Sequence, residues 1–155
     1  MSTNTITIRD ITLEQLQVQA GDLLQQHYEE LSVDTDAWPL SPDWTNLEAL
    51  AAGGLVHVAG AFVDDKMVGY VGSLLVRRHL HYPFGYVQND VLFVAKSHRS
   101  SSVGGRLMRS VRDWAKEMGA AQIFWHAKED TELHRQLDRP NGRYTLRDLI
   151  YSEKV

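Results

Sequence analysis

The sequence contains no cysteine among its 155 residues. This absence excludes disulfide bonds, zinc sites built from thiolates and a cysteine nucleophile. A chain without cysteine is compatible with a reducing compartment, so we expect a cytoplasmic protein. The seven histidines are scattered, and no pair has the HExxH spacing of a metal-binding helix. We therefore expect no metal site.

Long apolar runs are also missing. The first residues, MSTNTITIRDIT, lack the apolar core of a signal peptide. No segment approaches the roughly 18 consecutive apolar residues that a membrane helix needs. We expect neither a signal peptide nor a membrane partner.

Positive charge is not in excess, because 16 Lys and Arg residues face 20 Asp and Glu residues for a net charge of -4. This balance argues against nucleic acid as a partner, since such domains are usually basic. The length fits one domain spanning residues 1–155, because single cores commonly hold about 100–200 residues.

Four segments have the spacing of apolar residues that is typical of helices, or the caps that bound them. Thr12 can cap the first helix, and Gly21 is a weak position within it. Gly119 ends the third helix, and Pro140-Asn141-Gly142 ends the fourth. The helices are expected over residues 13–31, 45–53, 103–118 and 129–138.

Alternating or continuous apolar runs indicate strands over residues 5–11, 55–63, 67–76, 86–95 and 121–127, with one or two closing strands in 143–155. The second and third strands form a hairpin around a polar turn. The strands at 86–95 and 121–127 flank a helix, which makes them parallel neighbours joined by a crossover. The fold class is therefore mixed α/β, of the α+β kind.

The stretch HRSSSVGGRLM, from His98 to Met108, places three serines and two glycines at the start of the third helix. A helix start presents unpaired amides and a partial positive charge, and small side chains let a phosphate approach them. Taken alone, the same residues also fit a plain helix cap. The lysine of a nucleotide-binding P-loop and the GxGxxG fingerprint of dinucleotide folds are both missing.

The run from Val91 to Ala120, VLFVAKSHRSSSVGGRLMRSVRDWAKEMGA, resembles the signature of the GCN5-related N-acetyltransferases, the GNAT family. That family carries [Q/R]-x-x-G-x-[G/A] between its fourth strand and third helix. Arg99 to Gly104 matches this motif, with Ser102 in place of the first glycine. The order of elements matches as well. The resemblance implies a central mixed, mostly antiparallel sheet of six to seven strands, a parallel crossover and about four helices.

The resemblance also implies an enzyme that moves an acetyl group from acetyl-CoA to a primary amine of a small molecule or a protein by direct attack. The pantetheine arm would pair with the strand near residue 93, and the loop amides would hold the pyrophosphate. The residues implied to contact acetyl-CoA are Leu92, Phe93, Val94, Arg99, Ser100, Ser101, Ser102, Val103, Gly104 and Gly105.

Asp90 is the candidate general base, since relatives often carry a carboxylate there. Its alternative role is a strand-end acid that contacts solvent or a loop arginine. Asn89 should face the opposite side of the sheet. The tyrosine that usually serves as general acid is missing from the helix at 129–138. His134 is the first candidate to replace it and Tyr144 the second, although a lone histidine there also fits a structural role.

The loop at 32–44 and the turn at 79–85 should border the acceptor. Their candidate contact residues are Trp38, His81 and Tyr82. Acids beside aromatics would attract a cationic amine, basic residues with aromatics would hold an anionic acceptor, and both sets also fit simple loop anchors. A homodimer is compatible with the resemblance. The rival interpretations are a GNAT-fold module that binds acyl-CoA or a partner without turnover, and an interaction protein without cofactor.

Overall fold

The computed structural model describes residues 5–140 and 142–155. One five-stranded sheet has the order β1-β2-β3-β4-β5, and its neighbours are antiparallel except β4 and β5, which are parallel. The strands are β1 (Ile6–Asp10), β2 (Val56–Val63), β3 (Lys66–Val76), β4 (Tyr86–Val94) and β5 (Gln122–Phe124).

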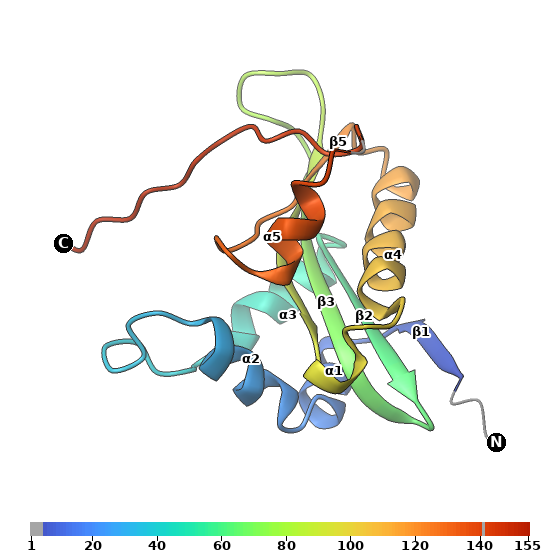
Figure 1. Cartoon of the computed structure of the whole chain (residues 1–155). Helices are drawn as coiled ribbons and strands as arrows, with labels where there is room; N and C mark the ends of the chain where they lie inside the picture. The colour runs from blue at the N-terminus through green and yellow to red at the C-terminus, as the bar shows by residue number, and fades with distance from the viewer. Residues whose placement is uncertain (1–4, 141) are drawn as a thin grey trace.

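Helices cover both faces of this sheet (Figure 1). They are α1 (Leu13–Gln19), α2 (Leu23–Leu31), α3 (Trp44–Ala52), α4 (Val103–Glu117) and α5 (Glu132–Leu137), with the short 3₁₀ helix η1 (Lys96–His98) before α4. One buried cluster joins α4 to Ala59, Ala61 and Val71 of the sheet. A second cluster joins α1 and α2 to Phe62 and Tyr70 on the opposite face.

The parallel crossover is confirmed, because β4, α4 and β5 follow one another and Tyr86–Gln88 pairs with Gln122–Phe124. The single helix expected over residues 13–31 is divided. Gly21 has a φ of +48°, which a continuous right-handed helix does not allow. The chain therefore has five described α-helices where about four were expected.

The expectation of six to seven strands is wrong, because the closing strands are not formed. Residues 143–155 contain neither helix nor strand, and their chain leaves the body of the molecule (Figure 1). A strand exists only where a neighbour accepts and donates its backbone hydrogen bonds, and β5 is only three residues long. Of the expected helix stop at Pro140-Asn141-Gly142, Asn141 lies outside the described residues.

Candidate functional site

β4 has one residue more than its partner β3 at Asp90. Gly72 of β3 lies opposite Val91, and the next residue, Ser73, lies opposite Asn89, so Asp90 is skipped by the ladder. This is a β-bulge, a feature that redirects side chains next to functional sites. The buried Asn89 amide holds it, because Nδ2 donates to the carbonyl oxygen of Val91 at 3.0 Å and to that of Gly72 at 3.4 Å.

The bulge changes which face of the sheet the following residues cover. Val87 packs on the α4 side, and strict alternation would place Val91 there too. Instead Val91 packs with the cluster on the side of α1 and α2, and Leu92 packs on the α4 side. Because of the bulge, Asp90 lies on the face of the sheet that α1, α2 and α3 cover. Asn89 is buried and, by alternation from Val87, lies on the α4 side.

A cavity of roughly 310 Å³ lies on that side, between the sheet and the helices α1, α2 and α3. This volume is at the lower end of the range for small-molecule sites, which is about 300–1,000 Å³. Asp90 and Val91 line it from β4, and Tyr70 and Gly72 line it from β3. The other lining residues are Leu13, Leu16, Leu24, His27, Tyr28, Ser32, Leu40, Pro42, Trp44, Leu47, Val56, Val58, Ser73 and Leu74.

Asp90 is the only acid among the described residues that line this cavity. Its side chain reaches solvent, but the surrounding walls desolvate it enough to raise the pKa of its carboxyl above the ordinary value, with nearby His126 opposing the shift. A carboxylate with a raised pKa holds a proton more firmly than a fully solvated one. It is therefore better suited to accept a proton near neutral pH.

His27 of α2 and Tyr70 of β3 form a second polar feature of the cavity wall. Their Nδ1 and hydroxyl oxygen are 2.6 Å apart, and the His27 ring stacks on Phe93 with 4.9 Å between centroids. Burial, helped by the charge of Lys128, lowers the pKa of His27 from 6.5 to about 4, and burial raises the pKa of Tyr70. Both side chains are therefore neutral at pH 7. Sequence reasoning missed this pair, because 43 positions separate its members and no local pattern joins them.

β4 has an open edge where β5 ends. Only three residues of each strand pair, so β4 continues through Leu92, Phe93 and Val94 beyond the last partner on β5. An exposed strand edge offers backbone donors and acceptors to an extended ligand. Leu92, Phe93 and Val94 are the residues that the family resemblance implies for pairing with the pantetheine arm.

The start of α4 has glycines that packing within the chain does not explain. A Cβ at Gly105 would meet nothing within 4 Å, and one at Gly104 would meet only Val94 Cγ2 at 4.0 Å. Neither glycine has a positive φ. Glycine weakens a helix by about 0.5–1 kcal/mol relative to alanine. The residues therefore fit a cradle that a ligand approaches closely, beside the exposed serines of residues 100–102.

Val103 is the first residue of α4, and its side chain is fully buried, so only its backbone can face a ligand. Arg99 is held by groups of the chain itself. Its guanidinium forms a bidentate pair with Glu30 of α2, at 2.6 and 2.7 Å, and its Nε donates to the Val94 carbonyl at 2.8 Å. It also lies 5.3 Å from the centroid of the Phe93 ring. The hydrogen bonds lower the pKa of Glu30 and raise that of Arg99.

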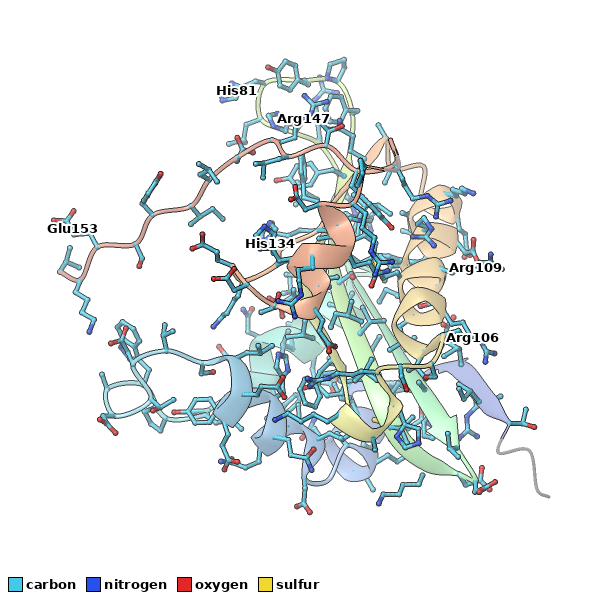
Figure 2. The ribbon with its side chains drawn as sticks, in the orientation of Figure 1. His81, Arg106, Arg109, His134, Arg147 and Glu153 are labelled. Carbon is cyan, nitrogen blue, oxygen red and sulfur yellow. The ribbon has the colours of Figure 1, made fainter. Side chains whose placement is uncertain are left out.

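The remaining candidates do not line the cavity. His134 lies on α5, where its Nδ1 accepts a hydrogen bond from the Asp130 amide at 3.1 Å. Trp38 is 58% exposed, and its carbonyl accepts a hydrogen bond from the Tyr28 hydroxyl. Figure 2 shows His81 on the loop between β3 and β4, at the far end of the view from α1 and α2, while His134 lies beside the sheet. Tyr82, on the same loop, stacks with Phe84.

Neither a metal cluster nor a membrane helix is found in the described part of the chain. No group of three or more His, Asp or Glu side chains is arranged to hold an ion there. None of the helices in residues 5–140 and 142–155 has both the length and the apolarity that crossing a bilayer requires.

Comparison with known proteins identifies the family. The profile of the acetyltransferase (GNAT) family matches residues 22–137. No curated protein sequence matches the chain. Among solved structures, the fold is similar to a ribosomal-protein-alanine N-acetyltransferase from Brucella melitensis biovar Abortus 2308, with a TM-score of 0.68 and 21% identity over 97% of both chains.

Two further structures share the fold. A putative acetyl transferase from Pyrococcus furiosus has a TM-score of 0.72 and 20% identity, over 97% of this chain and 100% of that one. The enzyme AAC(6')-Iy, in complex with the bisubstrate analogue CoA-S-monomethyl-acetylneamine, has a TM-score of 0.69 and 17% identity, over 97% and 99%.

Proposed function

The chain belongs to the GNAT family and is an N-acetyltransferase; on that premise we propose that it moves an acetyl group from acetyl-CoA to the primary amine of a small molecule or a protein. The observation that carries the proposal is the position of Asp90. The bulge brings a carboxylate with a raised pKa to the wall of a cavity, on the same strand whose edge is open beyond β5.

The donor site in this proposal follows the open edge of β4 and the start of α4. Leu92, Phe93 and Val94 pair with the pantetheine arm, and the amides of residues 100–105 hold the pyrophosphate. The empty space at Gly104 and Gly105 supports this fit, because a ligand there meets no Cβ. When bound, acetyl-CoA supplies the acetyl group and a thiol leaving group. Arg99 contributes through the position that it gives to Phe93 and Val94.

Asp90 is the general base of the proposed reaction. An aliphatic amine is protonated near neutral pH, as the lysine pKa of about 10.4 illustrates, and it must lose a proton before it attacks. Asp90 takes this proton directly or through one water. Such proton transfers commonly contribute about 10²–10⁴ in rate.

His134 remains the predicted general acid. Its Nδ1 accepts a hydrogen bond from the Asp130 amide, so the neutral ring carries its proton on Nε2. In the proposed reaction this proton is donated to the leaving thiolate. Tyr144 is the second candidate, and its hydroxyl accepts a hydrogen bond from Arg112 at 3.5 Å. Trp38, His81 and Tyr82 remain predicted contacts for an acceptor that extends beyond the cavity. The cytoplasm is the expected compartment.

Thiol release tests the proposal against a non-catalytic module. Purified protein with acetyl-CoA and a panel of primary amines should release CoA thiol faster than protein without amine. Asp90→Asn keeps the size of the side chain and should release thiol roughly 100-fold more slowly. Equal release by wild type and variant would remove Asp90 from the mechanism, and no amine-dependent release at all would support the non-catalytic module.

A further inference from the structure

The cavity beside Asp90 has one carboxylate and a long apolar wall. Beyond Asp90, the described lining residues include no other acid and no Lys or Arg. His27, the remaining ionisable group of basic type, is hydrogen-bonded to Tyr70 and stacked on Phe93. The walls of the cavity therefore complement a single positive charge.

Most of the rest of the wall consists of apolar side chains on three helices and the sheet, with polar atoms added by Tyr28, Ser32 and Ser73. Leu13 and Leu16 come from α1, Leu24 from α2, Trp44 and Leu47 from α3, and Val58 from β2. Leu13, Leu16 and Val58 are themselves buried. A second ammonium group placed against this wall would lose its hydration and find hydroxyl groups but no second carboxylate, which is costly. An apolar or aromatic group there would instead gain from burial.

The acids of the loop at 32–44 add no second carboxylate to the cavity wall. Asp43 caps α3 through a hydrogen bond from the Asn46 amide, and Asp34 pairs with Lys154. Neither of them lines the cavity, and neither does Asp36. The idea that the acids of this loop attract a cationic acceptor into the cavity is therefore not supported by their positions.

The loop between α2 and α3 is hydrogen-bonded to α2 and forms part of the cavity wall. The Tyr28 hydroxyl of α2 lies within hydrogen-bonding distance of the carbonyl oxygens of Thr35, at 3.1 Å, and Trp38, at 2.8 Å. Leu40 and Pro42 of this loop line the cavity beside Tyr28. The volume of roughly 310 Å³ admits a small molecule rather than a folded partner.

We propose that the acceptor is a small primary monoamine with an apolar or aromatic skeleton, whose amine meets Asp90 while its skeleton lies against α1, α2 and α3. This inference rests on the proposed acetyl transfer. In the reaction, the amine nitrogen forms a bond to the acetyl carbon as the carbon–sulfur bond breaks. Asp90 receives the first proton of the ammonium before the attack, and the second proton that the nitrogen loses as the amide forms neutralises the thiolate of CoA, which leaves as the thiol.

The test compares 2-phenylethylamine with spermidine and kanamycin in the thiol-release assay. We expect kcat/KM to be at least about tenfold higher for 2-phenylethylamine, since each misplaced charge or methylene in such a pocket costs about tenfold or more. Calorimetry should also detect binding of 2-phenylethylamine without turnover. Faster acetylation of spermidine or kanamycin would overturn the acceptor class while leaving acetyl transfer intact.

A second carboxylate placed in the cavity wall should change the choice of acceptor, and the same substitution outside the cavity serves as the control. Leu40 lines the cavity and is 40% exposed, so Leu40→Asp adds a second carboxylate at a tolerant position. It should raise the ratio of kcat/KM for spermidine over 2-phenylethylamine by about tenfold or more. Val18→Asp, at a site on α1 that is 77% exposed and outside the cavity lining, should leave the ratio unchanged. An unchanged ratio in Leu40→Asp would overturn the placement of the acceptor in this cavity.

Two different failures can be told apart. If 2-phenylethylamine gives no thiol release although another amine of the panel does, the acceptor class is wrong. If no amine gives thiol release, or the protein does not bind acetyl-CoA, the proposed function is wrong.

Discussion

Asp90 combines two properties that a proton acceptor needs. The bulge in β4 gives it access to a cavity, and the walls of that cavity raise the pKa of its carboxyl. Asn89 maintains this arrangement, because its amide occupies carbonyl groups on both sides of the bulge. The two neighbouring residues therefore have different roles: Asn89 shapes the strand, and Asp90 is the proposed general base.

The pH dependence of the reaction should report this carboxyl. A base works when deprotonated, so kcat/KM for the acceptor should fall as pH falls through the raised pKa of Asp90, above the ordinary aspartate value of about 3.9. A pH–rate profile of wild type and Asp90→Asn checks this. The variant should lack the break at the pKa of Asp90 and keep only the dependence that comes from the fraction of unprotonated amine, and an identical break in both proteins would assign it to another group.

His27 should make folding sensitive to acid. Its folded pKa of about 4 lies below the unfolded value of 6.5, so the unfolded chain binds the proton first. Stability is therefore lost as pH falls from about 6.5 toward 4, by no more than about 1.4 kcal/mol per pH unit. Urea unfolding at pH 7 and pH 5 should show a smaller loss for His27→Phe than for wild type.

The residual loss in that variant should come partly from His57, because burial lowers the pKa of His57 as well. His57 lies on the other side of the sheet, 3.2 Å from the Ser110 hydroxyl and stacked on Trp114. An equal loss in His27→Phe and wild type would show that His27 is not the group that titrates.

The start of α4 carries two glycines, which weaken a helix, at the place where we propose that the pyrophosphate binds. Gly105→Ala should stabilise the protein without ligand by about 0.5–1 kcal/mol, because a methyl group there meets open space and alanine favours the helix. Gly119→Ala is the matched control, since it also meets open space but has a φ of +70° and should destabilise. Thermal unfolding measures both, and a destabilised Gly105→Ala would show that packing requires the glycine.

The elements with the strongest sequence patterns are those the structure confirms. The apolar stripe of α4 and the hairpin of β2 and β3 are local features, and both appear where they were expected. The closing strands over residues 143–155 were wrong, because a strand also depends on a partner that the pattern does not reveal. The β4 bulge was not predicted either, since it arises from the register between β3 and β4.

The same reasoning separates the candidate site residues. Asp90 was predicted from its place on a strand, and the structure gives it a cavity. The cavity itself was not predicted, because α1, α2 and α3 form it with the sheet through contacts between distant segments. His134 was chosen from its place on the helix where relatives carry a tyrosine, and Tyr82 from the turn expected to border the acceptor. Such positions in the sequence do not fix which side chains converge, so both stay predictions.

In the molecule as a whole, β4 borders both of the proposed binding sites. The loop at the start of α4 is proposed to hold acetyl-CoA, and the cavity under α1, α2 and α3 is proposed to hold the amine. Figure 2 shows Arg106 and Arg109 on α4. Arg109 is exposed to solvent, whereas Arg106 is tied to the sheet, because its Nη1 donates to the carbonyl oxygen of Ile6 in β1 at 2.7 Å.

The homodimer remains a prediction, and it can be tested at the exposed apolar side chains of residues 143–155. Leu149, Ile150 and Tyr151 are 69%, 82% and 88% exposed, and exposed apolar side chains favour association. Sedimentation velocity should find a dimer that is lost when all three are replaced by serine. Val18→Ser with Val33→Ser, at similarly exposed positions elsewhere, should keep the dimer. A wild type that is monomeric at all concentrations would contradict the prediction.

Calorimetric titration with acetyl-CoA tests whether the start of α4 binds the pyrophosphate of the donor. We expect micromolar binding by wild type and its loss in Gly104→Glu, because a glutamate there would fill the space at the helix start and repel the pyrophosphate. Lys116→Glu, which places the same side chain in the last turn of α4, should bind as wild type does. No binding by folded wild type, or equal binding by Gly104→Glu, would contradict the account.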